Sequence, residues 1–362
     1  MTRTAVVLFT RDLRVHDHPA LAAARRDCDR VVPLFVLDER LLSASAKRTR
    51  FLHVPLAELR AALGLVVANG DPVEQTARFR PDAVYVSEDV SAHARRRAAR
   101  LTEHFELRLF PGITIVPPGE LAPAGRDHYR VFTPYWRAWR TRPLPAPVEC
   151  DRPLPVRPGP LSAHLHFGSV SPAELARRAS DELLRQLCWR DFFAQLLAAE
   201  PELEWRDMYP GRRVWRNDPE AVAAWKDGRT GYPFVDAAMR QLAVEGWIPN
   251  RQRLVAASLL VKQLRIDWRI GAAHFREHLL DGDAASNSGN WQWVAGTGAD
   301  PRPNRTFNPA RQGGLHDPEG GYVRRWLPEL ADLPAARIHD PTSEQRRALG
   351  CVDPICIEER VT

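Results

Sequence analysis

Short apolar runs alternate with segments of helical periodicity over the first 125 residues, and this alternation limits the possible folds more than any other feature. Runs rich in valine, leucine and phenylalanine without a polar face are typical of parallel strands covered by helices. The pattern predicts a doubly wound α/β domain over residues 1–125, with a parallel, Rossmann-like sheet. The predicted strands are residues 5–9, 31–38, 65–68 and 83–87, and the predicted helices are residues 18–27, 50–63 and 91–105.

A proline-rich segment separates this domain from a second half with a different pattern. Residues 134–160 contain eight prolines and almost no apolar periodicity, which predicts an extended surface linker, set here at residues 126–160. Beyond it, apolar residues recur at helical spacing, as in SDELLRQLCWRDFFAQLLAA, where Ser180 is expected to cap the helix. Residues 161–362 are therefore predicted to form an all-helical domain.

The charge and the tryptophan content favour a polyanionic or planar partner without establishing one. The net charge is +6 and the isoelectric point is near 9.3, which suits nucleic acid. Almost all of the positive charge is arginine, however, and an arginine excess also follows from the base composition of some genomes. Of the 11 tryptophans, eight fall between residues 189 and 293, where they could stack on a flat ligand or simply pack a core.

The cysteines and the hydropathy point to a protein without disulfides or membrane spans. Five cysteines lie far apart without a CxxC pair, which predicts reduced thiols and a cytoplasmic location. No segment resembles a signal peptide, and no window approaches the roughly 18 apolar residues of a membrane helix. We expect no membrane association.

The segment LLDGDAASNSGNWQWVAGTGADP, residues 279–301, combines Asp-Gly-Asp with asparagine, two tryptophans and four glycines. An EF-hand loop beginning at Asp281 would need an acid or amide at Ala285 and glycine at Ser286, so calcium is not expected. The segment has no cysteine or histidine for zinc. No GxGxxG follows the first predicted strand, so the fold does not imply NAD. We expect no metal here, but a large, flat ligand with polar edges.

Many segments of the chain resemble one family, the DNA photolyases and cryptochromes, which are flavoproteins driven by blue light. The resemblance begins at VVLFTRDLRVHDHPAL and continues through VFTPYWRAW, LSAHLHFGSVSP and CWRDFF. It is densest across TGYPFVDAAMRQLAVEGWIPNRQRLVAASLLVKQLRIDWR and residues 279–301, and it ends at FNPARQ and WLPEL. It implies an α/β antenna domain followed by a helical FAD-binding domain, in an unusually short protein similar to class I photolyases.

The resemblance implies a set of FAD contacts in the helical half. Asp281, Gly282 and Asp283 would border the flavin and its ribityl chain, and Asn287 would lie beside the flavin N5. Arg253 would pair with Asp281. The remaining implied contacts are Ser162 at the FAD phosphates, with Gln186 and Arg190 near both cofactor and lesion. On local sequence alone, a helix C-terminal turn with solvated acids is the favoured explanation of the two aspartates.

Three tryptophans match the electron-transfer chain of the family. Trp291 would lie nearest the flavin, Trp268 in the middle and Trp215 outermost. Indole is among the side chains most easily oxidised, so such a relay could refill a photo-oxidised flavin from the surface. The alternative is that all three are ordinary core residues.

Further positions match the surface that holds damaged DNA. Trp189 and Trp293 correspond to the aromatic pair that flanks a flipped-out pyrimidine dimer. The other implied lesion or DNA contacts are Gln186, Arg190, Asn250, Arg251 and Gln312. For Arg190 and Arg251 the alternative is a solvated charge on a helix face.

Departures from the family pattern bear on the reaction. Pro158 and Gly159 stand where phosphate-binding Thr and Ser are usual, and Gln186 replaces a glutamate common in cyclobutane-dimer photolyases. Asn250 and Leu254 occupy the positions of the histidines that (6-4) photolyases need, which argues against that reaction.

The resemblance therefore implies a monomeric deoxyribodipyrimidine photo-lyase that repairs cyclobutane pyrimidine dimers in damaged DNA with light and FAD. The alternatives are a cryptochrome-like photoreceptor without repair activity, or a non-catalytic flavoprotein that binds nucleic acid. A second, antenna chromophore of folate or deazaflavin type, another flavin, or none are all compatible with the sequence.

Overall fold

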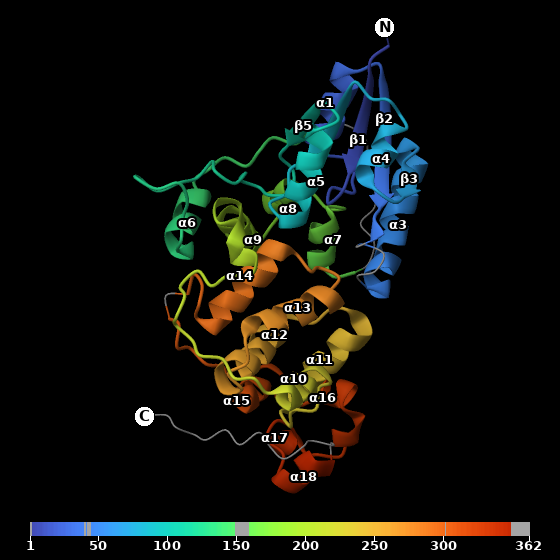
Figure 1. Cartoon of the computed structure of the whole chain (residues 1–362). Coiled ribbons are helices and arrows are strands. Elements are labelled where there is room, and N and C mark those ends of the chain that lie inside the picture. Colours follow the sequence, from blue (N-terminus) through green and yellow to red (C-terminus); the bar gives the residue numbers. More distant parts are fainter. Residues whose placement is uncertain (1, 40, 42–44, 149–158, 301, 349–362) are drawn as a thin grey trace. The chain divides into compact units, whose positions relative to one another are not determined.

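The computed structural model describes residues 2–39, 41, 45–148, 159–300 and 302–348 (Figure 1). The chain divides into two compact units. The first consists of residues 1–204 with 280–286, and the second of residues 205–279 with 287–362. This division reflects compactness, and the domain limits given by the sequence, at 125 and 160, stay a prediction.

The first unit contains a five-stranded parallel sheet in the order β3-β2-β1-β4-β5. Its strands are β1 (Thr4–Phe9), β2 (Arg30–Leu37), β3 (Val66–Asn69), β4 (Ala83–Ser87) and β5 (Leu107–Phe110). The doubly wound sheet and its four predicted strands are confirmed. The fifth strand was missed because LRLF is short and only partly buried at the sheet edge, so it lacks the continuous apolar run of the others.

Helices cover both faces of this sheet (Figure 1). Helices α1 (Pro19–Asp27) and α3 (Ala46–Leu63) pack on one face, where Phe9 and Tyr85 point. Helices α4 (Pro72–Ala77) and α5 (Ala92–Thr102) pack on the other. Strand order reverses between β1 and β4, so the loops after these strands border the crevice where ligands of such sheets usually bind.

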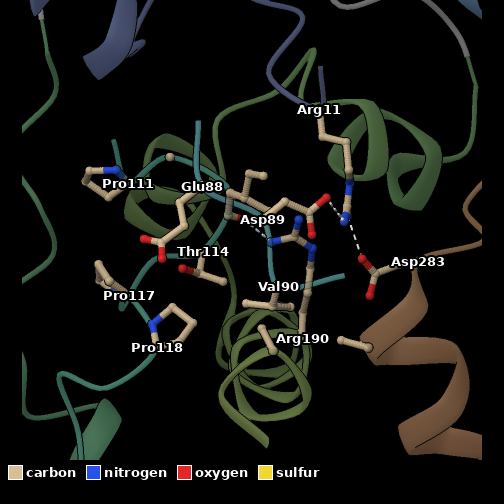
Figure 2. Close-up of a pocket in the computed structure, with 14 residues that line it drawn as sticks. Arg11, Glu88, Asp89, Val90, Pro111, Thr114, Pro117, Pro118, Arg190 and Asp283 are labelled. Atoms are coloured by element: carbon tan, nitrogen blue, oxygen red, sulfur yellow. Dashed lines mark hydrogen bonds and ion pairs between the residues drawn. The ribbon is translucent and has the colours of Figure 1, made fainter. Parts of the chain in front are cut away.

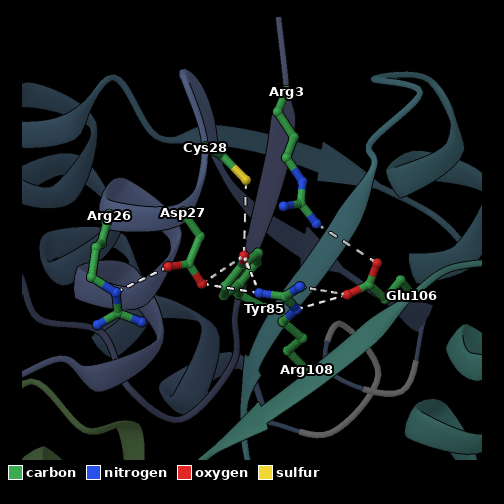
Figure 3. Close-up of polar contacts among 7 residues, drawn as sticks. All are labelled: Arg3, Arg26, Asp27, Cys28, Tyr85, Glu106 and Arg108. Carbon is green, nitrogen blue, oxygen red and sulfur yellow. Dashed lines mark hydrogen bonds and ion pairs between the residues drawn. The ribbon is translucent and has the colours of Figure 1, made fainter. Parts of the chain in front are cut away.

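A polar network fixes β4 and β5 to the end of α1 (Figure 3). Arg108 donates from Nη1 to Asp27 Oδ2 at 2.9 Å and to the Tyr85 hydroxyl at 3.1 Å, and it also pairs with Glu106. The Tyr85 hydroxyl donates to Asp27 at 3.3 Å and lies 3.8 Å from the Cys28 Sγ. Burial, reinforced by Cys28, raises the pKa of Tyr85 to about 12. The phenol therefore stays protonated at neutral pH and acts as a fixed donor.

The extended linker predicted from residue 134 is wrong for its first part, because residues Phe132–Trp139 form helix α6. Pro134 lies in the first turn, where a helix tolerates a missing N–H. Phe132, Tyr135 and Trp139 recur at helical spacing and are all buried. Residues 149–158, which include Pro158, lie outside the described residues. The other helices of this unit are α7 (Leu161–Phe167), α8 (Pro172–Arg177), α9 (Asp181–Ala199) and η1 (Pro201–Glu204).

Among its described residues, the second unit contains helices joined by loops and no strand. Its apolar core is built on α11, α12, the π-helical turn η2 and α13, and includes Trp225, Trp268 and Trp291.

The predicted Ser180 cap of α9, in the first unit, is confirmed: its side chain accepts from the Leu183 N–H. No helix in the described part of the chain is both long and apolar enough to span a membrane. The elements of the second unit are α10 (Pro219–Lys226), α11 (Pro233–Glu245), α12 (Asn250–Ser258), η2 (Leu259–Gln263), α13 (Trp268–His278), α15 (Pro309–His316), α16 (Gly321–Trp326), η3 (Pro328–Leu330), α17 (Ala335–Ile338) and α18 (Ser343–Ala348), and α14 (Ala284–Ala295) contributes its residues from 287 onward.

Candidate functional site

A buried cluster of charges in the first unit holds the Asp-Gly-Asp segment (Figure 2). Arg11, in the loop after β1, donates from Nη2 to Asp283 Oδ2 at 2.5 Å and from Nη1 to Asp89 Oδ2 at 3.2 Å. Its Nε donates to the His166 carbonyl at 3.0 Å. Arg11 therefore ties Asp283 to the loop that follows β4.

The charges of the cluster keep the Asp283 carboxylate ionised and the His166 imidazole neutral. Burial alone would raise the pKa of Asp283, but Arg11 and Arg190 hold that pKa well below its ordinary value. Burial and the Arg11 charge lower the pKa of His166 well below 6.5, so its imidazole stays neutral. The result is a pre-set anionic carboxylate beside two guanidinium groups, which cannot lose their protons at physiological pH.

Arg11, Asp89, Arg190 and Asp283 line one side of an open pocket of about 450 Å³, mouth included (Figure 2). Pro111, Pro117 and Pro118 line another part of its wall, with Thr114 and Glu88 nearby.

Asp283 also begins helix α14. Its Oδ1 accepts from the Ser286 N–H at 2.7 Å, so the carboxylate caps the helix while its other oxygen binds Arg11. Asp281 is buried, at 9% exposure, and within the first unit its charge opposes the burial-driven lowering of the pKa of Arg48 on α3. Asp281 is thus buried and Asp283 is held by Arg11 and by the start of α14, unlike the solvated acids that local sequence also allowed.

Further along α14, within the second unit, Asn287 and Trp291 lie one helical turn apart and share a face. The Asn287 Nδ2 donates to the Ala272 carbonyl of α13 at 2.9 Å. This bond orients the amide and leaves its Oδ1 as an acceptor. Trp291 packs on Gly271, where an added Cβ would lie 2.2 Å from the indole Cη2. Only glycine at this position of α13 lets the two helices approach so closely around Trp291.

The three predicted relay tryptophans lie in or against one core cluster of the second unit. Trp291 and Trp268 are 2% and 0% exposed, whereas Trp215 is only partly buried and packs on the edge of the cluster. This graded exposure suits a chain that runs from an interior site to solvent. Trp225 is also fully buried there, with its ring centroid 6.0 Å from that of Trp291.

The backbone after α14 is held by cations. Lys262 Nζ donates to the Ala295 carbonyl at 2.9 Å and to the Pro303 carbonyl, and Arg213 donates to the same two carbonyls. Burial lowers the pKa of Lys262 to about 8. Gly296 lies between these groups at φ +77°, and an added Cβ would lie 2.3 Å from the Pro303 oxygen. This explains one of the four glycines of the segment.

Two predicted DNA contacts are brought together in the second unit. Arg251 Nη1 donates to Gln312 Oε1 at 3.4 Å. Asn250, at the start of α12, is exposed. Trp293 is partly buried, and the Arg305 guanidinium lies 5.4 Å from its ring centroid. These residues stay predicted DNA contacts.

In the first unit, the predicted lesion contacts on α9 differ in how far they are exposed to solvent. Gln186 is exposed, while Trp189 stacks on Phe132 with centroids 3.6 Å apart and planes 3° apart. One indole face is therefore occupied. Arg190 donates to the carbonyls of Ile113 and Leu165, the second at 3.2 Å. Its guanidinium is turned toward the charge cluster, and the DNA contact inferred for Arg190 stays a prediction.

Two further predicted cofactor residues have local roles. Ser162 is partly buried in the first turn of α7. Arg253 donates from Nε to the Ile248 carbonyl at 2.9 Å. The predicted pair between Arg253 and Asp281 joins the two units and stays a prediction. Gly282, between the two aspartates, likewise keeps its predicted place beside the flavin.

The candidate site also includes residues that the sequence analysis did not identify. Arg11 lies in the quoted motif TRDLR, but nothing local predicts that it binds a residue 272 positions away. Asp207 accepts a hydrogen bond from the Trp268 indole. In the sequence, its only distinguishing feature is its place a few residues before Trp215.

The protein combines a doubly wound α/β sheet with a helical core that is rich in tryptophan. The segment that carries Asp281, Asp283 and Asn287 adds ordered polar groups. These features are typical of a cofactor-binding protein with two domains. Comparison with known proteins makes this specific. Residues 5–155 match the family model "DNA photolyase", and residues 183–354 match the "FAD binding domain of DNA photolyase". The chain is 42% identical to the deoxyribodipyrimidine photo-lyase of Streptomyces griseus, over 97% of this chain and 96% of that protein. The protein belongs to the DNA photolyase family.

Solved structures agree with this assignment. An archaeal photolyase from Sulfolobus tokodaii, described with two FAD molecules, has a TM-score of 0.83 at 30% identity and covers 93% of this chain and 92% of its own. A Synechocystis cryptochrome has a TM-score of 0.84 at 25% identity, over 97% of this chain and 94% of its own. The alignment with the Streptomyces protein runs over 436 positions against 362 residues here, so that relative carries segments that this chain lacks.

FAD is the cofactor of the matched helical domain, and the side chains fit it. Asn287 has its donor committed to Ala272, which leaves an acceptor suited to a protonated ring nitrogen. The Gln252 Oε1, one residue from Arg253, is buried without a hydrogen-bond partner among the described residues. Such an orphaned acceptor is expected where a polar ligand belongs.

Proposed function

We propose that the protein is a light-driven deoxyribodipyrimidine photo-lyase that repairs cyclobutane pyrimidine dimers in DNA. The 42% identity over nearly the full length of a photo-lyase supports the enzyme class. Asn250 and Leu254, in place of histidines, favour cyclobutane dimers over (6-4) products. The observation that carries the proposal is the shared face of Asn287 and Trp291 on α14. It supports the proposal because an amide that would contact the flavin and an oxidisable indole lie one turn apart.

When bound and reduced, FAD supplies on blue-light absorption the electron that opens the cyclobutane ring. Asn287 would accept a hydrogen bond from the ring nitrogen, oriented by its own bond to Ala272. Asp281 and Asp283 would border the ribityl chain, with Asp283 held by Arg11. Ser162 would contact the phosphates, and Gln186 would bind the lesion from the exposed side of α9. These residues bind and orient, because the photochemistry belongs to the cofactor.

Trp291, Trp268 and Trp215 would return electrons from the surface to the flavin site. The two inner indoles are fully buried, so their oxidation occurs away from solvent and side reactions. Trp215, partly buried, would exchange electrons with external reductants. This relay serves photoreduction and is separate from the repair step itself.

For the DNA partner, Trp189 and Trp293 would flank the flipped dimer, with Asn250, Arg251 and Gln312 on the backbone or lesion. Because one face of Trp189 is stacked on Phe132, only its other face would remain for a base. Replacing Arg251 by Ala should weaken binding to all DNA sequences and reduce the slope of affinity against salt by about 1. An unchanged slope in a salt titration would remove Arg251 from the interface.

The deciding assay illuminates the chemically reduced protein with an oligonucleotide that contains one dimer. Restored pyrimidines support the lyase. Flavin photoreduction without restoration supports the cryptochrome-like photoreceptor, an alternative that the Synechocystis similarity keeps open. A protein that binds the oligonucleotide but shows neither change is the non-catalytic flavoprotein.

A second chromophore is compatible with an open pocket in the first unit, whose space measures about 970 Å³ with the solvent at its mouth included. Asp38 and Asp71, which follow β2 and β3, line it together with Arg96, Arg97 and Arg100 of α5. Arginines suit the acidic groups of a folate, deazaflavin or flavin antenna. Arg96→Ala should lower the content of any second pigment, measured after extraction, while FAD content is retained. Equal pigment in both proteins would place the antenna elsewhere.

We further infer that the protein acts as a monomer in the cytoplasm. The free thiols of Cys28 and Cys188 are compatible with a reducing compartment. Sedimentation at working concentration tests the oligomeric state.

A further inference from the structure

The middle tryptophan of the relay has an ionic hydrogen-bond partner. Trp268, at the start of α13, is fully buried, and its Nε1 donates to Asp207 Oδ1 at 2.7 Å. Asp207 lies on the segment between η1 and α10, and its side chain is 14% exposed. This is a short, charge-assisted bond from an indole that belongs to the apolar core cluster of the second unit.

The charge beside Trp268 is negative overall. Arg269 donates from Nη2 to Asp207 at 2.9 Å, and from Nη1 to both oxygens of Asp267 at 2.9 and 3.0 Å. Two carboxylates thus share one guanidinium, which lies 4.8 Å from the centroid of the Trp268 ring. Arg269 alone would disfavour a positive charge on that ring, and the pair of aspartates offsets it.

Oxidation changes the chemistry of the indole N–H. An indole that has lost one electron carries a positive charge and is a far stronger acid than neutral indole. A positive charge is costly in a buried, weakly polar site unless it is paired or removed. Asp207 already accepts the relevant hydrogen bond, so a proton can cross to it without any rearrangement.

We propose that Asp207 accepts the Nε1 proton of Trp268 when Trp268 passes an electron to oxidised Trp291. The N–H bond breaks, an O–H bond forms on Asp207, and Trp268 becomes a neutral radical. When Trp215 then supplies an electron, the proton returns to Nε1 and both groups regain their starting states. This inference rests on the proposed electron relay and adds a proton acceptor to it.

A purely structural role for Asp207, in which it only orients the indole, predicts a different behaviour. Oxidised Trp268 would then remain a cation, and deuterated solvent would not affect how its spectrum evolves. The two roles therefore differ in a spectroscopic property of the radical and not in the stability of the fold.

The test uses the full-length, flavin-loaded protein with Trp215→Phe, which stops the relay at Trp268. After a blue-light pulse on the oxidised flavoprotein, transient absorption distinguishes the cation from the neutral radical by their visible bands. Asp207→Asn keeps size and hydrogen bonding but removes the basic oxygen, and Asp207→Glu restores a carboxylate. Asp267→Asn is the matched control, since it removes the other carboxylate of Arg269 without touching the indole. A measurement in the dark accompanies these: the indole N–H resonance of Trp268 should shift in Asp207→Asn and stay in place in Asp267→Asn.

With Asp207 or Glu at this position, the neutral radical should form, and its appearance should slow at least twofold in deuterated water. With Asn, the cation should persist and the isotope effect should be lost. A persistent cation with Asp207 intact overturns the inference alone. No tryptophan radical in any variant overturns it together with the relay, whereas dimer repair by chemically reduced protein reports separately on the proposed function.

Discussion

Helix α14 begins in one kind of interior and continues in another. Its cap, Asp283, belongs to a cluster of buried charges in which Arg11 bridges two carboxylates. Its later turn carries Trp291 into an apolar core of aromatic and aliphatic side chains in the second unit. Ion pairs set position at a large desolvation cost, whereas the apolar core keeps an oxidisable ring dry. The comparison indicates that the charges hold the segment in place, while the apolar core encloses the indoles that we propose carry electrons.

The largest expected effect comes from removing an electron carrier. Trp268→Phe should reduce flavin photoreduction to background, because phenylalanine is much harder to oxidise than indole, while chemically reduced protein still repairs dimers. Trp225→Phe is the control: it removes an indole from the same core, with its centroid 6.0 Å from that of Trp291, and should leave photoreduction in place. Steady-state illumination followed by flavin absorbance measures both. Equal losses in the two variants would contradict the assigned relay.

Breaking the charge cluster should mainly cost stability and cofactor retention. Asp283→Asn removes one of the two carboxylates that pair with Arg11, together with its charge that also acts on Arg190, and should lower the free energy of unfolding by about 3–5 kcal/mol. Glu120→Gln, which removes an exposed pair with Arg142, should cost no more than about 1 kcal/mol. Urea titration compares the two. If Asp283→Asn were as mild as the control, the cluster would not hold the segment.

Crowding the aromatic core should have an intermediate effect. In Gly271→Ala the new methyl would lie 2.2 Å from Trp291 Cη2 and 2.7 Å from Leu260 Cδ2, so the indole must move. We expect a loss of about 1–3 kcal/mol and slower photoreduction. Gly314→Ala, in α15 with open space around it, should gain up to about 1 kcal/mol from helix propensity. Thermal unfolding checks the opposite signs, and a neutral Gly271→Ala would show that the contact is not tight.

The smallest expected effect is a pH dependence of the folding stability, which should come from the charge cluster of the first unit and not from the apolar core of the second. The pKa of His166 is below 6.5 in the folded chain, so unfolding takes up a proton once the pH falls below about 6.5. Stability should then decrease by up to about 1.4 kcal/mol per pH unit from this group. His166→Gln should flatten the slope in that window. Denaturant midpoints between pH 5 and pH 7 measure it, and an unchanged slope would assign the pH dependence to other groups.

Local patterns predicted the fold well where a single signal dominates. The strand at 83–87 and the cap at Ser180 follow from a continuous apolar run and a capping residue. Helix α6 was missed because Pro134 and the prolines that follow the helix suggested a linker, although Phe132, Tyr135 and Trp139 share one face. Strand β5 was missed because an edge strand needs little apolar surface.

The site was predicted only through similarity to a known family. Motif matching placed Trp215, Trp268 and Trp291 together, and the structure puts all three in or against one core. It could not supply Arg11 or Asp207, whose partners lie far away in sequence and depend on how the chain folds. It could not supply the bonds of Arg190 either, whose guanidinium donates to carbonyls of other elements, and the DNA contact inferred for Arg190 stays a prediction.

The most direct test of the account is an action spectrum for dimer loss with chemically reduced protein and a dimer-containing duplex. We expect no loss in the dark, and under illumination a loss per photon that follows the absorption of the reduced flavin. A protein that is loaded with flavin and bound to the duplex, yet leaves the dimers intact at every wavelength, would contradict it.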